Sequence, residues 1–177
     1  VRDLHHVKEV HIVSVSNECR EMLVVMSDKD SDGTTVYCVN DNSLFKFRSD
    51  DVRIPAIACS EEFKYLYEPN SSIMKAGCFG AISDEYDVQS LGNNSHLFVG
   101  NSLINDFPGR KFMVNKIFSL NKRDIKDNLS GLCQANITVR NFPMSVAELR
   151  KKLKLRDGGS VYLFATTLSD GSKVIIN

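Results

Sequence analysis

The sequence predicts an α+β fold with mixed sheets and helices packed on one face. The chain has 177 residues, of which 42% are hydrophobic and 25% are charged. These values are typical of a globular protein and exclude wholesale disorder, and the length suffices for a real core without disulfide or metal. Strand-like runs fill the first part of the chain, whereas residues 107–177 alternate between strand and helix patterns.

The first fifty residues read as strands. Residues 9–15 are β-branched and continuously apolar, which is typical of a strand buried on both faces. Further strands are predicted at 22–26 and 34–39, with a polar turn at 28–33 between them. Because so few edge strands would not be stable alone, we expect residues 9–47 to be the margin of a sheet.

The middle of the chain predicts a linker, a helix and a short strand. Residues 50–62 are the linker, because Pro55 would interrupt a strand ladder. Residues 67–82 predict one helix with Pro69 near its first turn, and 96–100 predict a strand. The small residues of this helix would let another backbone approach closely: Ala76, Gly77, Gly80 and Ala81.

The last part of the chain has the clearest alternation of element types. The predicted order is strand 110–119, helix 122–131, strand 135–141, helix 145–155 and strands 161–167 and 172–176. Ser145 and Glu148 predict a capping box at the second helix, which Gly158-Gly159 would end. The Asp170-Gly171 pair predicts a type I′ turn between the last two strands.

The charge is distributed unevenly along the chain. The 22 Lys and Arg residues balance 22 Asp and Glu residues, so the formal net charge is zero. Residues 1–106, however, hold 9 basic and 17 acidic side chains, whereas residues 107–177 hold 13 basic and 5 acidic ones, giving −8 and +8. Because a polyanion responds to the local field of one lobe, zero net charge does not argue against nucleic acid.

The basic residues of the second part come from several elements, which favours phosphate contacts over a merely solvated helix face. Binding of RNA through its backbone needs many cations on one lobe and little sequence-specific geometry. The candidate RNA-binding residues are Arg110, Lys111, Lys116, Lys122, Arg123, Lys126, Arg140, Arg150, Lys151, Lys152 and Lys154, with Arg156 beside them. Phe142 or Tyr162 could stack on unpaired bases, but both are better explained as core residues.

The sequence contains only incomplete matches to motifs for catalysis or metal binding. Residues 28–33 match the first half of a calcium loop, but its closing position is Val39, so we expect a solvated acidic hairpin. Ser72 and Lys75 fit a Ser-x-x-Lys pattern without the partner motifs of acyl-transfer enzymes. The sequence has no glycine-rich nucleotide loop, no Cys-x-x-Cys and no histidine at metal-ligand spacing. We therefore assign no catalytic residue and no metal ligand.

The five cysteines are odd in number and widely spaced, which fits reduced thiols in the cytoplasm and buried, inert side chains. No segment is apolar enough to predict a membrane span, and the first residues lack the apolar region and cleavage pattern of a signal peptide. Because the chain begins with Val1 rather than Met, we expect a piece of a longer protein, although a processed end would look the same.

Four segments together resemble a known family: Tyr65–Gly77, Ile137–Pro143, Val146–Leu153 and Tyr162–Thr167. In that order they are similar to the C-terminal part of bacterial class I S-adenosylmethionine-dependent methyltransferases that carry a THUMP-like domain. The resemblance implies three parts. These are the terminal strands of a methyltransferase-type domain with a linker (1–62), a ferredoxin-like segment (63–106) and a THUMP-like α/β domain (107–177).

The resemblance also implies a function. THUMP-type domains present RNA to an attached modifying enzyme, so the chain is expected to bind tRNA or rRNA for a methyltransferase domain that lies upstream of it. The methyl-donor loop and catalytic motifs of the family are absent from this sequence, so S-adenosylmethionine is expected only in the longer parent, and whether this chain is an enzyme stays open. The alternatives are a protein-interaction or structural module without nucleic acid and, more remotely, a hydrolase using Ser72 or a cysteine.

Overall fold

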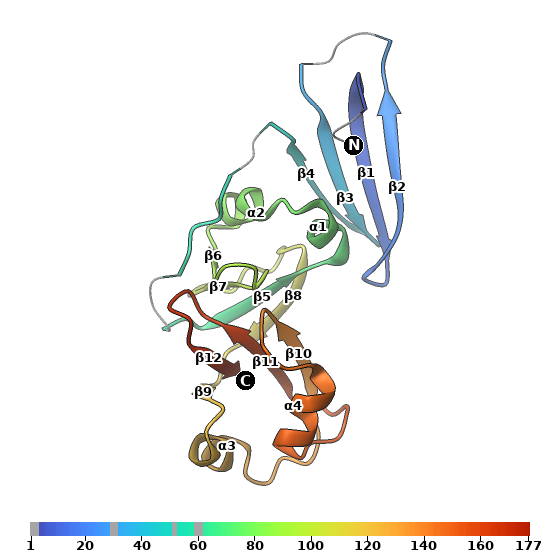
Figure 1. Cartoon of the computed structure of the whole chain (residues 1–177). Coiled ribbons are helices and arrows are strands. Elements are labelled where there is room, and N and C mark those ends of the chain that lie inside the picture. The colour runs from blue at the N-terminus through green and yellow to red at the C-terminus, as the bar shows by residue number, and fades with distance from the viewer. Residues whose placement is uncertain (1–3, 29–31, 51–52, 59–61) are drawn as a thin grey trace. The chain divides into compact units, whose positions relative to one another are not determined.

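The computed structural model describes residues 4–28, 32–50, 53–58 and 62–177 (Figure 1). Three four-stranded sheets and a few short helices make up these residues, so the predicted α+β class with mixed sheets is confirmed. The chain divides into two compact units. The first unit comprises 1–56, 67–88 and 104–111, and the second comprises 57–66, 89–103 and 112–177.

Sheet A belongs to the first unit and has the strand order β2–β1–β3–β4. Its strands are β1 (Val7–Val15), β2 (Glu18–Met26), β3 (Thr35–Asn40) and β4 (Ser43–Arg48). The central strands β1 and β3 run parallel, and each pairs antiparallel with an edge strand. The strands predicted at 9–15, 22–26 and 34–39 are thus confirmed.

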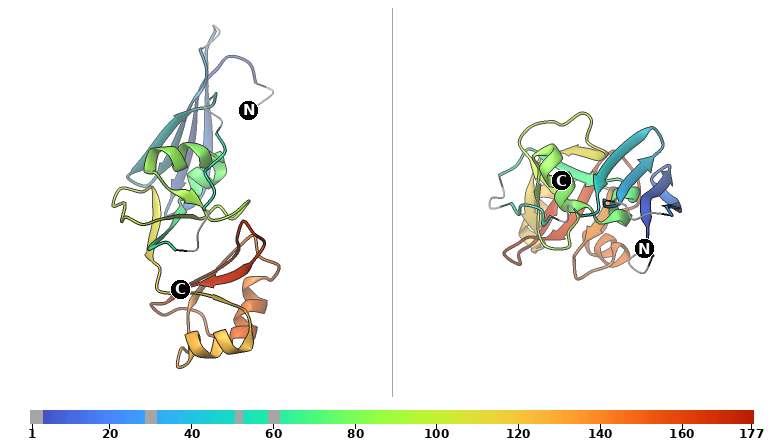
Figure 2. Two further views of the ribbon diagram at one scale, coloured as in Figure 1. Left: turned by 90° about the vertical axis from the view of Figure 1, so that its left-hand side faces the viewer. Right: turned by 90° about the horizontal axis from the view of Figure 1, so that it is seen from above.

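The inner face of sheet A is covered by the helix α1 (Ser71–Ala76), as Figures 1 and 2 show. Val10, Ile12 and Val36 are buried there, together with the thiol of Cys38. A hydrogen bond with Cys78 raises the pKa of Cys38 most, and burial and the nearby Cys78 charge raise it further. A buried thiol that stays protonated is a poor nucleophile, so Cys38 is a core residue.

The single helix predicted over 67–82 is wrong. Residues Tyr65–Pro69 form strand β5, and two short helices follow, α1 and α2 (Phe79–Tyr86). The Asn70 side chain caps α1 by accepting a hydrogen bond from the Ile73 amide, so the proline precedes the helix. The helix then ends at Gly77, whose positive φ of 70° lets its N–H reach the Ile73 carbonyl.

The expected close backbone approach occurs at Gly80. A Cβ added there would lie 2.7 Å from the Cβ of Arg53 and closer still to the Arg53 carbonyl. The predicted linker, residues 50–62, passes this point, but its positions 51–52 and 59–61 lie outside the described residues. The same holds for residues 29–31 of the predicted acidic hairpin and for Cys59.

The strand predicted at 110–119 is two strands in different sheets. Sheet B has the order β6–β7–β5–β8, with β6 (Gln89–Ser90), β7 (Phe98–Gly100) and β8 (Gly109–Met113). Strand β9 (Ile117–Ser119) belongs to sheet C. Asn115 lies between the two strands, and its N–H donates to the Asn177 carbonyl at 2.6 Å. This segment is therefore hydrogen-bonded to the C-terminal residue and does not continue the strand pairing of β8.

Sheet C and its two helices form the C-terminal part of the second unit. The sheet has the order β10–β11–β12–β9, with β10 (Asn136–Arg140), β11 (Tyr162–Thr167) and β12 (Lys173–Ile176). The helices α3 (Lys122–Leu129) and α4 (Val146–Leu153) lie on one side of it (Figure 2). Of the expected helix at 122–131, the last two residues lie beyond α3.

The alternation of side chains in sheet C separates two cores. Leu163 and Ile175 point to the helix side, where they pack against Leu149 and Leu153 of α4. Their neighbours on the strands, such as Phe164, pack instead into a second cluster that contains Leu66, Leu97 and Val99. The period of two in a strand thus buries both faces of β11 and β12.

The helix α4 begins as predicted and ends differently. Ser145 and Glu148 form the predicted capping box. The helix stops at Lys154, which is left-handed with φ 57°, before it reaches Gly158. The N–H of Leu155 donates to the Arg150 carbonyl at 3.2 Å, and the Leu155 side chain is buried. The helix therefore ends where Leu155 becomes buried, before the two glycines that were predicted to end it.

The hairpin between β11 and β12 does not have the predicted type I′ turn. Gly171 is left-handed with φ 88°, but Asp170 is absent from the positive-φ residues, and a type I′ turn needs both. The N–H of Gly171 donates to the Leu168 carbonyl, and the N–H of Leu168 donates to the Ser172 carbonyl. This is a three-residue loop with glycine at its left-handed position, a common alternative for the same Asp-Gly signal.

The capping box makes the stability of α4 depend on pH. Hydrogen bonds from the Ser145 N–H and then from its hydroxyl lower the pKa of Glu148 from its usual 4.5. A lowered folded-state pKa adds stability above the unfolded value, and this contribution is lost as the pH falls through the folded value. We expect Glu148→Gln to remove this part of the acid sensitivity, which urea midpoints of both proteins on either side of pH 4.5 would measure. Parallel acid profiles would contradict the assignment.

Candidate nucleic-acid interface

A basic groove runs beside α4 in the second unit. Four cations line it, with Val146, Ala147 and Leu155 as the apolar part of the lining: Arg150, Lys151, Lys154 and Arg156. The described lining contains no Asp or Glu. The helix brings Arg150, Lys151 and Lys154 to one side because residues three and four apart share a helical face. Phosphate oxygens would meet several cations in this groove, of which Arg150 is already paired with Asp157 outside the lining.

Arg150 is the most constrained of these cations. One terminal nitrogen, Nη2, lies 2.8 Å from Asp157 Oδ1, and the side chain is only 23% exposed. The other terminal nitrogen, Nη1, is buried and has no hydrogen-bond partner among the described residues. A buried donor without a partner is costly, and an arginine held on one side by a carboxylate keeps its position. Arg150 is therefore a fixed cation, whereas Lys151 and Lys154 are exposed and adaptable.

The remaining cation of α4 does not line the groove. Lys152 is exposed on the same helix but is not part of the groove lining. Of the three cations of α4, Arg150 and Lys151 line the groove and Lys152 does not, while the C-cap residue Lys154 lines it as well. The sequence shows only a run of basic residues and does not predict which of them line the groove.

The cations of α3 form a second exposed set in the same unit. Lys122, Arg123 and Lys126 are exposed, and Arg123 makes only a long contact of 3.7 Å with Asp127. An exposed pair within one helix contributes little to stability, so Arg123 is available to an anionic ligand. Lys116 is also exposed, just before β9.

Arg140 stands apart from these residues. It is half-buried at the end of β10. Burial of His96 lowers the pKa of that histidine most, and the positive charge of Arg140 lowers it further. The neighbouring Asn141 donates from Nδ2 to the Asn93 carbonyl at 2.8 Å, which joins this strand end to the loop before His96. Arg140 thus contributes to local structure as well as to the positive charge of the unit.

Arg110 and Lys111 belong to the first unit, not to the unit of the groove. Arg110 forms an ion pair with Glu68, whose carboxylate is 4% exposed, and its Nε donates to the same oxygen at 2.8 Å. The Lys111 ammonium donates to the Asn105 carbonyl at 2.9 Å. A buried carboxylate needs a partner, so one role of Arg110 is to balance the charge of Glu68.

The two aromatic candidates for base stacking have protein contacts. Phe142 is half-buried and packs against the core beneath α4. Tyr162 is 36% exposed, and its ring centre lies 5.0 Å from that of Phe112. The contacts of Phe142 agree with its interpretation as part of the core, whereas Tyr162 is an exposed side chain that packs on Phe112.

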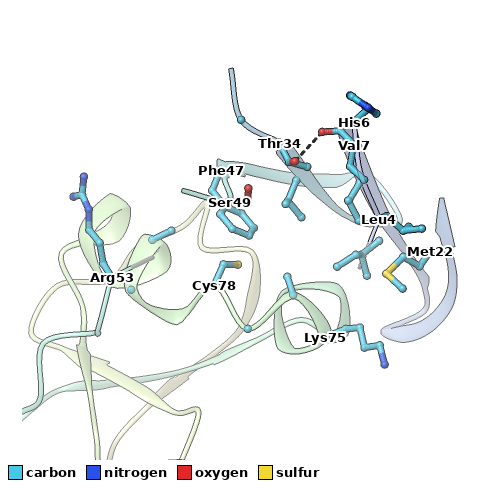
Figure 3. A pocket seen from close by; sticks show the side chains of 18 of the residues that line it. Leu4, His6, Val7, Met22, Thr34, Phe47, Ser49, Arg53, Lys75 and Cys78 are labelled. Carbon is cyan, nitrogen blue, oxygen red and sulfur yellow. Dashed lines mark hydrogen bonds between the residues drawn. The ribbon is translucent and has the colours of Figure 1, made fainter. Parts of the chain in front are cut away.

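A second hollow lies in the first unit, between the inner face of sheet A and the helices (Figure 3). Its volume is about 700 Å³. Phe47, Met22 and the sulfur of Cys78 point into it, whereas Lys75 and Arg53 turn their charged ends away. No local sequence pattern predicts this cavity, because its walls come from segments far apart in the chain.

The cavity does not suit S-adenosylmethionine. Binding of a nucleoside normally uses a carboxylate for the ribose hydroxyls and a glycine-rich turn at a helix start. No Asp or Glu is among the described residues that line the cavity, and the sequence has no such glycine loop. Among the described residues there is also no group of three or more His, Cys, Asp or Glu side chains that could hold a metal ion.

Family models match two consecutive parts of the chain. A ferredoxin-like domain model matches residues 65–108, and a model described as THUMP domain-like matches residues 109–177. The chain carries a ferredoxin-like domain followed by a THUMP-like domain. The groove beside α4 and the cations of α3 all lie in the THUMP-like domain, whereas Glu68 of the ion pair lies in the ferredoxin-like one.

A solved structure extends the similarity beyond these two domains. The crystal structure of a putative methyltransferase from Porphyromonas gingivalis W83 matches with a TM-score of 0.88 and 33% sequence identity. The match covers 99% of this chain and 46% of the other, so the chain spans about half the length of that protein. No curated protein matches the sequence. No helix in the described part of the chain is long and apolar enough to cross a membrane.

Proposed function

We propose that this chain is the RNA-binding, substrate-presenting region of an S-adenosylmethionine-dependent methyltransferase that acts on tRNA or rRNA. The observation that carries the proposal is the groove beside α4, which gathers Arg150, Lys151, Lys154 and Arg156 in a THUMP-like domain without an acidic residue in its described lining. Cations in an open groove suit the phosphates of structured RNA, which proteins recognise mainly through shape and backbone.

The proposal assigns catalysis to another part of a longer polypeptide. The similarity to a protein about twice as long supports this division, and S-adenosylmethionine would bind in the part that this chain lacks. Residues 1–62 would then be the last strands of the methyltransferase-type domain and a linker, 63–106 the ferredoxin-like segment and 107–177 the THUMP-like domain. We also propose a cytoplasmic location, which the free thiols of Cys19, Cys38, Cys78 and Cys133 support.

Titration of the chain with unfractionated tRNA at several salt concentrations tests the proposal. We expect binding at low salt, with the logarithm of the association constant falling linearly with the logarithm of salt concentration at a slope of about −3 to −4, as for three or four phosphate contacts. Fluorescence anisotropy between about 50 and 200 mM salt measures this slope. No affinity at low salt, or affinity without salt dependence, would contradict RNA binding.

A protein-interaction module without nucleic-acid binding is the competing function. The exposed apolar strand β2 favours it, because apolar edge strands pair with other chains. The two functions use different surfaces, so RNA affinity and partner affinity separate them: a pure interaction module shows the second without the first.

A further inference from the structure

Strand β2 has a sequence that does not match its surroundings. Met22-Leu-Val-Val-Met26 is a continuous apolar run, which is the pattern of a strand covered on both faces. In the structure eight of the nine residues of β2 are exposed. Leu23 and Met26, on opposite faces of the strand, are 52% and 57% exposed.

The position of β2 adds a second mismatch. It is an edge strand of sheet A and pairs only with β1 among the described strands (Figure 1). The opposite edge, β4, has an alternating pattern with the charged residues Lys46 and Arg48, as expected of an edge that remains in water. The two edges of one sheet therefore differ in pattern: the charged residues of β2 are confined to its first half, and its second half is a continuous apolar run.

The apolar surface continues from β2 around the edge of the sheet. Met22 lines the cavity shown in Figure 3, next to the buried residues Val10 and Ile12 of β1. The nearby cation Arg53 is paired with Asp84 at 2.7 Å, and its charged end turns away from the hollow. Without converging polar groups, this hollow suits an apolar protein surface better than a small polar ligand.

The residues matched by the domain models and by the solved structure indicate which part of the protein covers the apolar edge at β2. The two domain models match residues 65–108 and 109–177, so sheet A belongs to neither of them. The solved structure nevertheless matches 99% of the chain, sheet A included, and more than half of that protein lies outside the match. Sheet A belongs to neither domain and has one uncovered apolar edge. It could therefore connect the ferredoxin-like and THUMP-like domains to the part of the complete protein that corresponds to the unmatched region.

We propose that β2 is an intramolecular docking strand: the upstream part of the methyltransferase-type domain, of which residues 1–62 would be the last strands, packs on both faces of β2 and beside its free edge. This rests on the proposed function in requiring that such an upstream part exists, and it does not depend on RNA. Leu23 and Met26 lie at the centre of the contact, while Leu44 on β4, three strands away across sheet A, lies outside it.

Co-expression of the tagged 177-residue chain with the part of the Porphyromonas gingivalis protein outside the match tests the proposal. The wild-type chain is expected to carry this part through purification, and hydrogen exchange in the complex slows at the amides of β2 but not at those of β4. Leu23→Lys and Met26→Lys each reduce the recovered partner at least about tenfold, because each puts a charge into an apolar interface.

Leu44→Lys is the matched control, since Leu44 is 60% exposed on the opposite edge of the same sheet. It should leave recovery unchanged. Equal recovery with Leu23→Lys and wild type, or no recovery with wild type, overturns the proposal. A wild-type dimer that Leu23→Lys dissociates also overturns it, in favour of a second copy of the chain. RNA affinity, measured on the same variants, should stay at the wild-type value, so a failure of RNA binding is seen separately.

Discussion

Reversing the charges of Lys151 and Lys154 together is expected to weaken RNA binding about 100-fold at low salt. Both lysines are exposed and line the groove beside α4, and neither supports the core. Each lost phosphate contact removes about one unit from the salt slope, so Lys151→Glu with Lys154→Glu should flatten it by about two units. Titration of both proteins with the same tRNA measures affinity and slope together.

Lys152→Glu is the matched control for this double variant. It changes the net charge of the same helix by the same amount per substitution, but Lys152 is not in the groove lining. We expect a change of only a few-fold, due to the weaker field of the domain. If Lys152→Glu weakens binding as much as either groove substitution, RNA responds to total charge and the groove is not the site. Circular dichroism of each variant verifies that the fold is intact.

The start of α4 could be predicted from the sequence, but the position of its end and the lysines that line the groove could not. The capping box of Ser145 and Glu148 is a local pattern, and the structure contains it as predicted. The end of α4 depends on the burial of Leu155 against a distant sheet, which no local signal reveals. Which cations share the groove depends on that end, because Arg156, which lies beyond the left-handed Lys154, joins Arg150 and Lys151 in the lining.

The strand predictions show the same limit. A β-branched, continuously apolar run predicts the strand at 9–15, which is β1, but the one strand predicted at 110–119 is two strands, β8 and β9. The break there is set by hydrogen bonds to Asn177, at the far end of the chain. Likewise, the charge split of the sequence placed Arg110 with the basic residues, whereas a buried partner, Glu68, engages it in the structure.

The largest stability effect is expected from Gly109→Ala. Gly109 opens β8 at the first residue of the THUMP-like match, where its backbone lies against the end of β5. A Cβ added there would lie 2.8 Å from Pro69 Cα and closer still to the Glu68 carbonyl oxygen. Both neighbours are backbone atoms that cannot rotate away, so the strands must separate. Overpacking of this kind costs up to about 3 kcal/mol in the free energy of unfolding.

Gly77→Ala separates this steric effect from backbone strain. Gly77 has φ 70°, but a Cβ there would meet no atom within 4 Å. The alanine should cost only about 1 kcal/mol, the usual penalty of a left-handed residue with a side chain. Urea unfolding of the two variants measures both values. Separation of β8 from β5 would also disturb the ion pair between Arg110 and Glu68, leaving a buried carboxylate without its partner. Equal losses in the two variants would contradict the close approach at Gly109, because the steric clash there would then cost no more than the left-handed backbone at Gly77.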